Sequence, residues 1–162
     1  MVPMVTKNRI VVAYFTKGGA TEEYAKIITD TLKEMNLTVD IYNLAQDSPD
    51  ITEYDTIVLG TGVRMFRVYG KWKKILKQKG LESKHLFMFL SSGIAIDEPE
   101  KAVEKFLQPL VKKFKLNPES LISFPGKIPE KWVKEDDEKE TMKPDLAKGW
   151  AKEISQHVQS NN

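Results

Sequence analysis

Short apolar runs alternate with amphipathic stretches along the whole chain, and this alternation limits the fold more than any other feature. The continuous apolar run Ile10–Phe15 is rich in β-branched residues and predicts a strand that is buried on both faces. Thr21–Met35 places apolar residues at helical spacing opposite charged ones, which predicts an amphipathic helix. Further strands are predicted at Thr38–Tyr42, Thr56–Gly60, His85–Leu90 and Leu121–Phe124, and further helices at Lys71–Lys79, at Glu98–Phe114 and over Leu146, Trp150, Ile154 and Val158.

Strands that alternate with helices are typical of an α/β fold in which helices cover both faces of a parallel sheet. We therefore expect a three-layer sandwich around a five-stranded parallel sheet. Five strands suit the doubly wound order 2-1-3-4-5, which we adopt from known folds of this kind. In such sheets the ligand binds beyond the carboxyl ends of the strands, beside the first strand. The loops after the first, third and fourth strands are therefore the candidate binding loops.

The length and composition of the chain limit the number of domains and the kinds of redox and metal site that it can form. The 162 residues suit one domain, and we expect residues 1–8 and 160–162 to be flexible ends. The chain has no cysteine, which excludes disulfides, thiolate metal sites and thiol redox chemistry. Its two histidines, His85 and His157, are too few for a metal site built from histidine, and we expect both at the surface. A redox function would then require a bound organic cofactor.

Net charge and hydropathy indicate whether nucleic acid or a membrane is an expected partner. A net charge of +2 gives no indication of a nucleic-acid partner. Met1–Asn8 lacks the apolar core of a signal peptide. No apolar run approaches the ~20 residues that a membrane-spanning helix needs. We therefore expect a cytoplasmic protein that does not insert into a membrane.

The loop after the first strand combines two glycines with two hydroxyl residues at the start of a helix: Thr16, Lys17, Gly18, Gly19, Ala20 and Thr21. Glycine lets the backbone approach a ligand closely, and free amides at a helix N-terminus favour an anion. Threonine hydroxyls add further donors, so the loop suits a phosphate group. The alternative interpretation is a tight turn in which Thr21 caps the helix. The Walker loop and the dinucleotide-binding glycine pattern are both absent.

Strand, loop and helix together resemble the phosphate loop Thr/Ser-x-Thr-Gly-x-Thr of the flavodoxin family, with Thr16, Gly19 and Thr21 in matching positions. Gly18 departs from this pattern, because the family usually has a second hydroxyl residue there. The segment Tyr54–Gly60 is similar to the third strand of flavodoxin-like proteins. The residues after it resemble the flavin loop Gly-x-Ser-Ile-Arg-Tyr of the flavodoxin-like protoporphyrinogen dehydrogenases: Thr61, Gly62, Val63, Arg64 and Met65.

The resemblance implies that FMN is the cofactor. It places the phosphate on the loop after the first strand and the flavin ring against the loop from Thr61 to Tyr69. After the fourth strand, the small residues Ser91, Ser92 and Gly93 suit close approach to the ribityl chain. The alternative interpretation is an ordinary surface loop with Arg64 solvated, followed later in the chain by a strand-to-helix turn capped by Asp97. Many flavodoxins place an aromatic residue in that turn, and this chain has none there.

Two functions are consistent with the resemblance. One is a flavodoxin that works as a low-potential electron carrier, with no catalytic residue, and with redox partner proteins docking at the exposed flavin edge. The other is an oxidoreductase of the protoporphyrinogen dehydrogenase type, which passes electrons to a quinone. That branch carries a long insertion suited to a membrane surface. Here the stretch Gly126–Lys143 contains the acidic run Glu135–Glu138, which anionic lipid would repel, and this favours the carrier.

A third class, the phosphoacceptor receiver, needs aspartates at the carboxyl ends of the first and third strands. Those ends read Tyr14-Phe15-Thr16 and Leu59-Gly60-Thr61, without a carboxylate. The sequence therefore does not favour a receiver domain.

Overall fold

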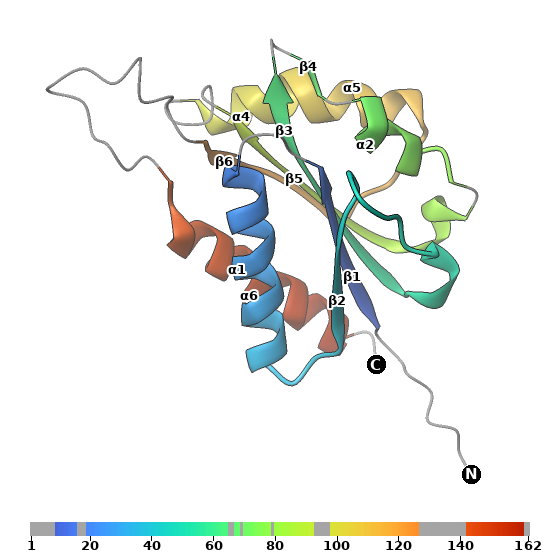
Figure 1. Cartoon of the computed structure of the whole chain (residues 1–162), viewed down its shortest axis with the longest axis vertical. Coiled ribbons are helices and arrows are strands. Elements are labelled where there is room, and N and C mark those ends of the chain that lie inside the picture. The colour runs from blue at the N-terminus through green and yellow to red at the C-terminus, as the bar shows by residue number, and fades with distance from the viewer. Residues whose placement is uncertain are drawn as a thin grey trace, which may run out of the picture.

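The computed structural model describes residues 9–15, 19–64, 67–68, 70–78, 80–92, 98–126 and 142–160. It is a three-layer α/β sandwich in which helices lie on both faces of one twisted sheet (Figure 1). The strands are β1 (Ile10–Phe15), β2 (Val39–Asn43), β3 (Thr56–Arg64), β4 (Arg67–Val68), β5 (His85–Ser92) and β6 (Ser120–Pro125).

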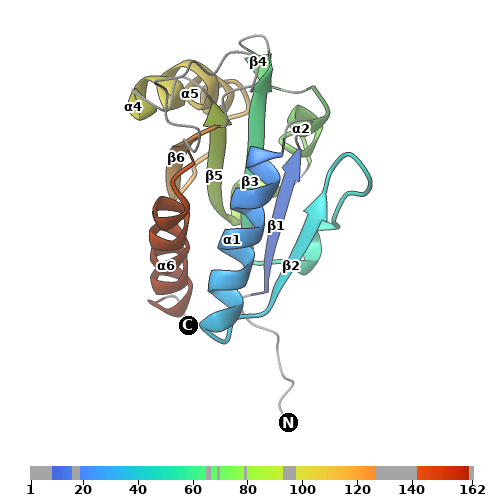
Figure 2. The same ribbon diagram turned by 60° about the vertical axis from the view of Figure 1, so that its left-hand side comes forward.

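The sheet has the order β2-β1-β3-β5-β6, and every pair along this path is parallel. This confirms the order 2-1-3-4-5 predicted from the sequence. Phe15 pairs with Thr61, and Gly62 pairs with Ser91, so the carboxyl ends of β1, β3 and β5 lie at the same edge of the sheet. Figure 2 shows their arrowheads at the edge where helix α1 (Ala20–Glu34) begins.

Two layers of helices cover the sheet. Helices α1 and α6 (Pro144–Ser160) lie on one face, and the other face carries α2 (Gly70–Ile75), α4 (Pro99–Ala102) and α5 (Gln108–Lys113) (Figures 1 and 2). The π-helical segment Val103–Leu107 joins α4 to α5, and the 3-10 turns η1 (Ile51–Glu53) and η2 (Leu81–Ser83) precede β3 and β5. Within the described ranges, no helix has the length and apolar character needed to cross a membrane.

The side chains of β1 divide between two buried clusters. Val11, Ala13 and Phe15 pack in the cluster that includes α2 and α5, whereas Ile10, Val12 and Tyr14 pack in the cluster that includes α1 and α6. All six are at most 4% exposed. Because both faces of the strand are covered, it has no polar side, which explains its continuous apolar sequence.

The third strand is longer than the sequence predicts. Gly60-Thr61-Gly62 looks like the start of a loop, yet β3 continues to Arg64 and pairs antiparallel with β4, Val63 with Val68 and Arg64 with Arg67. The prediction of a loop over Thr61–Tyr69 is therefore wrong for these strand residues. Parallel pairing with β5 explains the extension, because β5 also runs on to Ser92 and supplies backbone partners as far as Gly62.

Two predicted helices differ in detail. Helix α2 ends at Ile75 instead of Lys79. The predicted helix Glu98–Phe114 contains the π-helical segment, which lies directly before Gln108-Pro109. Pro109 has no N–H for the carbonyl four residues earlier, so a regular α-helix is interrupted there. Of the ends expected to be flexible, residues 1–8 and 161–162 lie outside the described residues, and Ser160 is the last residue of α6.

Candidate functional site

The first turn of α1 lies at the carboxyl edge of the sheet, where the phosphate loop was predicted. Gly19 is the N-cap of the helix, with φ of 103°, a left-handed conformation that favours glycine. It provides no side-chain cap, so the alternative interpretation of Thr21 as the capping residue is wrong. The amides of Ala20, Thr21 and Glu22 have no carbonyl acceptor within the helix. This end of α1 therefore presents N–H donors, while Thr16, Lys17 and Gly18 lie outside the described residues.

Thr21 connects this turn to the end of β5. Its Oγ1 lies 2.7 Å from Oγ of Ser91, and both side chains are almost completely buried. In a pair of hydroxyls one group donates to the other, so the second proton stays available to an additional acceptor. The structure thus brings together Thr21 and Ser91, two residues that the sequence assigned to different parts of one ligand site.

In the sheet, the carboxyl-terminal part of β3 lies between the ends of β1 and β5. Thr61 pairs with Phe15 of β1 and with Leu90 of β5, and its side chain is fully buried. Its hydroxyl donates to the carbonyl of Gly62 over 2.9 Å. The hydroxyl of Thr61 is therefore engaged within its own strand. Val63 and Arg64 are the last two residues of β3, and the predicted Met65 lies outside the described residues.

Ser92 is the last residue of β5, on the side of the site that is next to β6. The last pair of β5 and β6 joins Ser92 to Pro125, and the amide of Gly126 donates to the Ser92 carbonyl over 2.9 Å. A Cβ on Gly126 would approach the Ser92 backbone to 3.4 Å, so the two segments are closely packed. This pairing fixes the backbone immediately before Gly93, which itself lies outside the described residues.

The hydroxyl of Tyr24 makes two hydrogen bonds that the sequence did not predict. The sequence placed Tyr24 on the apolar side of the first helix, where its ring does stack on Phe124 at a centroid distance of 4.7 Å. Its hydroxyl also donates to the carbonyl of Pro125 over 2.5 Å and accepts from the amide of Lys143 over 3.0 Å. One side chain thus holds the end of β6 and the residue before α6, on either side of residues 127–141, which lie outside the described ranges.

Gly60 of β3 and Phe89 of β5 are paired in the sheet, directly before the strand residues of the candidate site. A Cβ on Gly60 would lie 2.0 Å from Cζ of Phe89, so the ring occupies the space that any larger residue at position 60 would need. This is the physical reason for glycine at the end of the segment that resembles a flavodoxin strand. This packing holds the part of β3 that directly precedes Thr61 and Gly62.

The first turn of α1 carries two carboxylates, Glu22 and Glu23. The carboxylate of Glu22 lies 3.2 Å from Nζ of Lys26, one turn along the helix. Burial, followed by the negative charge and hydrogen bonding of Glu22, raises the pKa of Tyr14 above its usual value. Tyr14 is therefore neutral at physiological pH. Lys26 offsets the charge of Glu22, whereas Glu23 adds a second carboxylate beside the free amides of this helix end.

A flavin phosphate is compatible with this arrangement. Gly19 allows close backbone approach, the first turn of α1 supplies N–H donors, and the Thr21–Ser91 pair adds a hydroxyl donor at the same edge. The pocket of about 270 Å³ lined by Leu44, Ser48, Lys74, Ile75 and Gln78 contains none of the predicted flavin-binding residues. We therefore assign the candidate site to the carboxyl ends of β1, β3 and β5.

The two histidines lie far from this site, at the opposite edge of the sheet. His85 begins β5 and His157 is in the last turns of α6, and both approach Glu119. They are partly buried and in contact with each other, a proximity that neither the sequence spacing nor the helical pattern reveals.

Comparison with known proteins identifies the family to which the chain belongs. A sequence profile described as "Flavodoxin domain" matches residues 11–142. Protoporphyrinogen IX dehydrogenase [quinone] of Escherichia coli (strain K12) is 23% identical over 95 residues, which is 57% of this chain and 52% of that enzyme. The chain thus spans about half the length of the curated relatives that it matches.

Solved structures have the same architecture. Oxidised flavodoxin 1 from Bacillus cereus superposes with a TM-score of 0.66 at 17% identity, covering 93% of this chain and 99% of that protein. Rubredoxin oxygen:oxidoreductase from Desulfovibrio gigas gives a TM-score of 0.67 at 14% identity, covering 96% of this chain but 37% of the larger protein. At these identities the likeness establishes the fold.

Proposed function

We propose, from the premise that this chain belongs to the flavodoxin domain family, that it binds FMN and transfers electrons between partner proteins. The observation that carries the proposal is the convergence of the uncapped first turn of α1 with the Thr21–Ser91 hydroxyl pair at the carboxyl ends of β1, β3 and β5. Amide and hydroxyl donors suit a phosphate group, and FMN carries one where riboflavin does not.

The residues divide between the parts of the cofactor. The phosphate would be held by the backbone of Gly19 and Ala20 and by the hydroxyl of Thr21, together with the preceding Thr16, Lys17 and Gly18. The flavin ring would lie against Thr61–Met65, and the ribityl chain against Ser91–Gly93. When bound, the flavin supplies the electron-accepting chemistry that a chain without cysteine lacks.

The described strand ends support a carrier. Phe15 and Ser92 are the last residues of β1 and β5, and neither has a side chain that works as an acid or base near neutral pH. The same holds for Thr61, Gly62 and Ser91, although β3 itself runs on to Arg64. Electron transfer between docked proteins needs no such group. Partner proteins would dock at the exposed edge of the flavin, and a near-neutral net charge of +2 argues against strong electrostatic steering of that encounter.

The identity of the cofactor can be tested directly. The purified protein is expected to show flavin absorption and to release FMN, not FAD or riboflavin, on denaturation. An anaerobic redox titration followed by absorption then measures the potential of the bound flavin. A colourless protein that also leaves the fluorescence of added FMN unquenched would refute the proposal.

A second function is favoured by one observation, the 23% identity over 95 residues to protoporphyrinogen IX dehydrogenase. In this alternative the protein would oxidise a porphyrinogen and reduce a quinone. The acidic run Glu135–Glu138 disfavours attachment to an anionic membrane, where apolar substrates of this kind accumulate. Quinone-dependent oxidation of protoporphyrinogen, together with binding to anionic lipid vesicles, would establish the enzyme in place of the carrier.

A further inference from the structure

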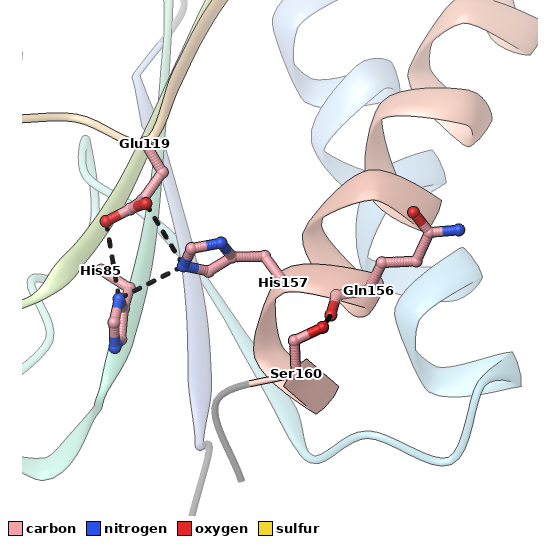
Figure 3. Close-up of polar contacts among 5 residues, drawn as sticks. All are labelled: His85, Glu119, Gln156, His157 and Ser160. Atoms are coloured by element: carbon pink, nitrogen blue, oxygen red, sulfur yellow. Dashed lines mark hydrogen bonds and ion pairs between the residues drawn. The ribbon is translucent and has the colours of Figure 1, made fainter.

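Three metal-binding side chains meet at the amino ends of β5 and β6, on the opposite side of the sheet from the candidate flavin site. His85 is the first residue of β5, Glu119 directly precedes β6, and His157 lies near the end of α6 (Figure 3). The backbone holds the strand residues in place, since the amide of His85 donates to the Asp55 carbonyl and that of Glu119 donates to the Leu86 carbonyl. Three separate elements thus supply one potential ligand each.

Four potential ligand atoms lie close together, because each oxygen of the Glu119 carboxylate faces a different histidine ring. Nδ1 of His85 lies 3.4 Å from Nε2 of His157 and 3.6 Å from Oε1 of Glu119, and Nε2 of His157 lies 3.3 Å from Oε2 of Glu119. In a tetrahedron the edge is about 1.63 times the distance from centre to corner. The edge of 3.4 Å between the two nitrogens therefore matches an ion with bonds of roughly 2.1 Å, the length of Zn–N bonds in proteins, and one ligand atom from each of the three residues lies within 4.8 Å of the other two.

Mg²⁺ and Ca²⁺ fit less well. In an octahedral site the same edge between the two nitrogens would require bonds of roughly 2.4 Å, which are too long for Mg²⁺. Ca²⁺ accepts bonds of that length but selects oxygen ligands, and two of these three atoms are imidazole nitrogens. Two histidines and one carboxylate form a donor set that is typical of zinc sites with one open position.

The surroundings restrict the two rings. The ring of His157 packs edge-on against Phe87 at a centroid distance of 5.5 Å and against His85 at 5.2 Å. The side chains of His85, Glu119 and His157 remain 42%, 34% and 30% exposed, so the cluster is open to solvent while its rings are held by packing. Binding through Nδ1 of His85 and Nε2 of His157 leaves the other nitrogen of each ring to carry its proton.

We propose that His85, Glu119 and His157 form a Zn²⁺ site with three protein ligands and one position for water. The ion ties the C-terminal end of α6 to the amino ends of β5 and β6, so its role is to stabilise the fold. An ion that binds the folded chain at 100 times its dissociation constant raises the folding equilibrium constant about 100-fold. The site is independent of the flavin proposal, because it shares no residue with the flavin site and lies at the other edge of the sheet.

The chain makes a clean test possible, because His85 and His157 are its two histidines and it has no cysteine. The untagged, flavin-loaded protein is titrated with Co²⁺, whose tetrahedral complexes absorb to the red of the flavin bands, and then with Zn²⁺. We expect one equivalent of Co²⁺ to produce these bands and Zn²⁺ to displace it. Competition with a coloured chelator then gives the Zn²⁺ affinity.

Variants assign the ligands. His85→Gln, His157→Gln and Glu119→Gln should each lower the Zn²⁺ affinity by at least about 10-fold, the effect seen even for residues that only support a ligand. Glu153→Gln, which removes the same charge from an exposed position one turn away on α6, should leave the affinity unchanged. Far-UV circular dichroism and flavin absorption confirm that each variant is folded.

A second measurement does not depend on colour. Zn²⁺ should raise the thermal midpoint of the wild-type protein but not that of the His85→Gln/His157→Gln double variant. The proposal is overturned if the wild type binds Zn²⁺ no more tightly than this folded double variant, since the three residues would then form a hydrogen-bonded cluster without a metal. A wild-type protein that binds the flavin but shows no such Zn²⁺ binding would refute this site and leave the proposed function untouched.

Discussion

The side-chain oxygens of Thr21 and Ser91 lie 2.7 Å apart, which joins the first turn of α1 to the carboxyl end of β5. Seventy residues separate the two along the chain, and both side chains are buried. Their contact places the helix amides and the strand-end hydroxyls at one edge. A cofactor that uses both groups would therefore be sensitive to a change at either residue.

Replacing Thr21 with valine should weaken FMN binding more than riboflavin binding. Valine keeps the shape of the side chain but removes the hydroxyl, and a charge-assisted hydrogen bond to a phosphate contributes about 1.5–3 kcal/mol. We expect the dissociation constant for FMN to rise roughly 10- to 100-fold, with a much smaller change for riboflavin, both measured by fluorescence quenching.

Thr31→Val is the matched control, because Thr31 lies on the same helix and donates locally to the Ile27 carbonyl. It should change neither affinity. Equal weakening of FMN and riboflavin binding by Thr21→Val would show that Thr21 does not contact the phosphate.

Gly60→Ala should destabilise the fold. The added Cβ would lie 2.0 Å from Cζ of Phe89, and forcing extra volume into a packed core typically costs about 1–3 kcal/mol. Urea denaturation should show this loss. Gly149→Ala is the opposite case, since nothing lies within 4 Å of the new Cβ in helix α6, and it should stabilise by up to about 1 kcal/mol.

The double variant Gly60→Ala/Phe89→Leu separates a steric clash from other effects. Leucine removes part of the ring, so the alanine should cost less in its presence, and the two changes should be non-additive. If the two costs simply add, the contact between residue 60 and Phe89 is not the cause.

Local patterns predicted the elements that depend on burial alone. The bounds of Ile10–Phe15 are confirmed without change, because a strand covered on both faces needs an uninterrupted apolar run. The continuation of β3 beyond Gly60 was not predictable in this way. Gly60-Thr61-Gly62 has the composition of a turn, and it becomes a strand because β1 and β5 provide backbone partners on its two sides.

The site was predictable in outline and not in its contacts. The sequence identified Gly19, Thr21 and Ser91 as members of one site from the loops that follow the strands, and the structure brings Thr21 and Ser91 together. No local pattern predicts the contacts of the Tyr24 hydroxyl or the cluster of His85, Glu119 and His157. The residues that meet in them lie 34 to 119 positions apart in the chain. The assignment of individual residues to FMN stays a prediction.

Tyr24→Phe should loosen the connection between β6 and α6. The change removes the bond to the Pro125 carbonyl and the acceptor of the Lys143 amide, and each unsatisfied buried group costs about 1–3 kcal/mol. We expect a lower free energy of unfolding and faster hydrogen exchange at the Lys143 amide, followed by NMR. Unchanged exchange at Lys143 would show that the Tyr24 hydroxyl does not hold this end of α6.

The contribution of Tyr54 to stability should disappear at alkaline pH. Tyr54 is almost fully buried, and its hydroxyl donates to Oδ2 of Asp40 over 2.7 Å, while Nη2 of Arg9 lies 3.3 Å from the same oxygen. Burial first, and then the hydrogen bonds with Asp40 and Tyr42, raise the pKa of Tyr54 well above its usual value.

The sign of the pH effect follows from this shift. A tyrosine whose pKa is higher in the folded than in the unfolded state stabilises the fold fully below the unfolded pKa of about 10, and this stabilisation falls as the pH rises above that value. Tyr54→Phe should therefore lower the free energy of unfolding at pH 7, and the difference from the wild type should shrink as the pH is raised past about 10. Urea denaturation of both proteins across this range measures the difference, in which the titration of groups common to both cancels. A difference that stays constant with pH would mean that Tyr54 acts through the packing of its ring and not through the hydrogen bond to Asp40.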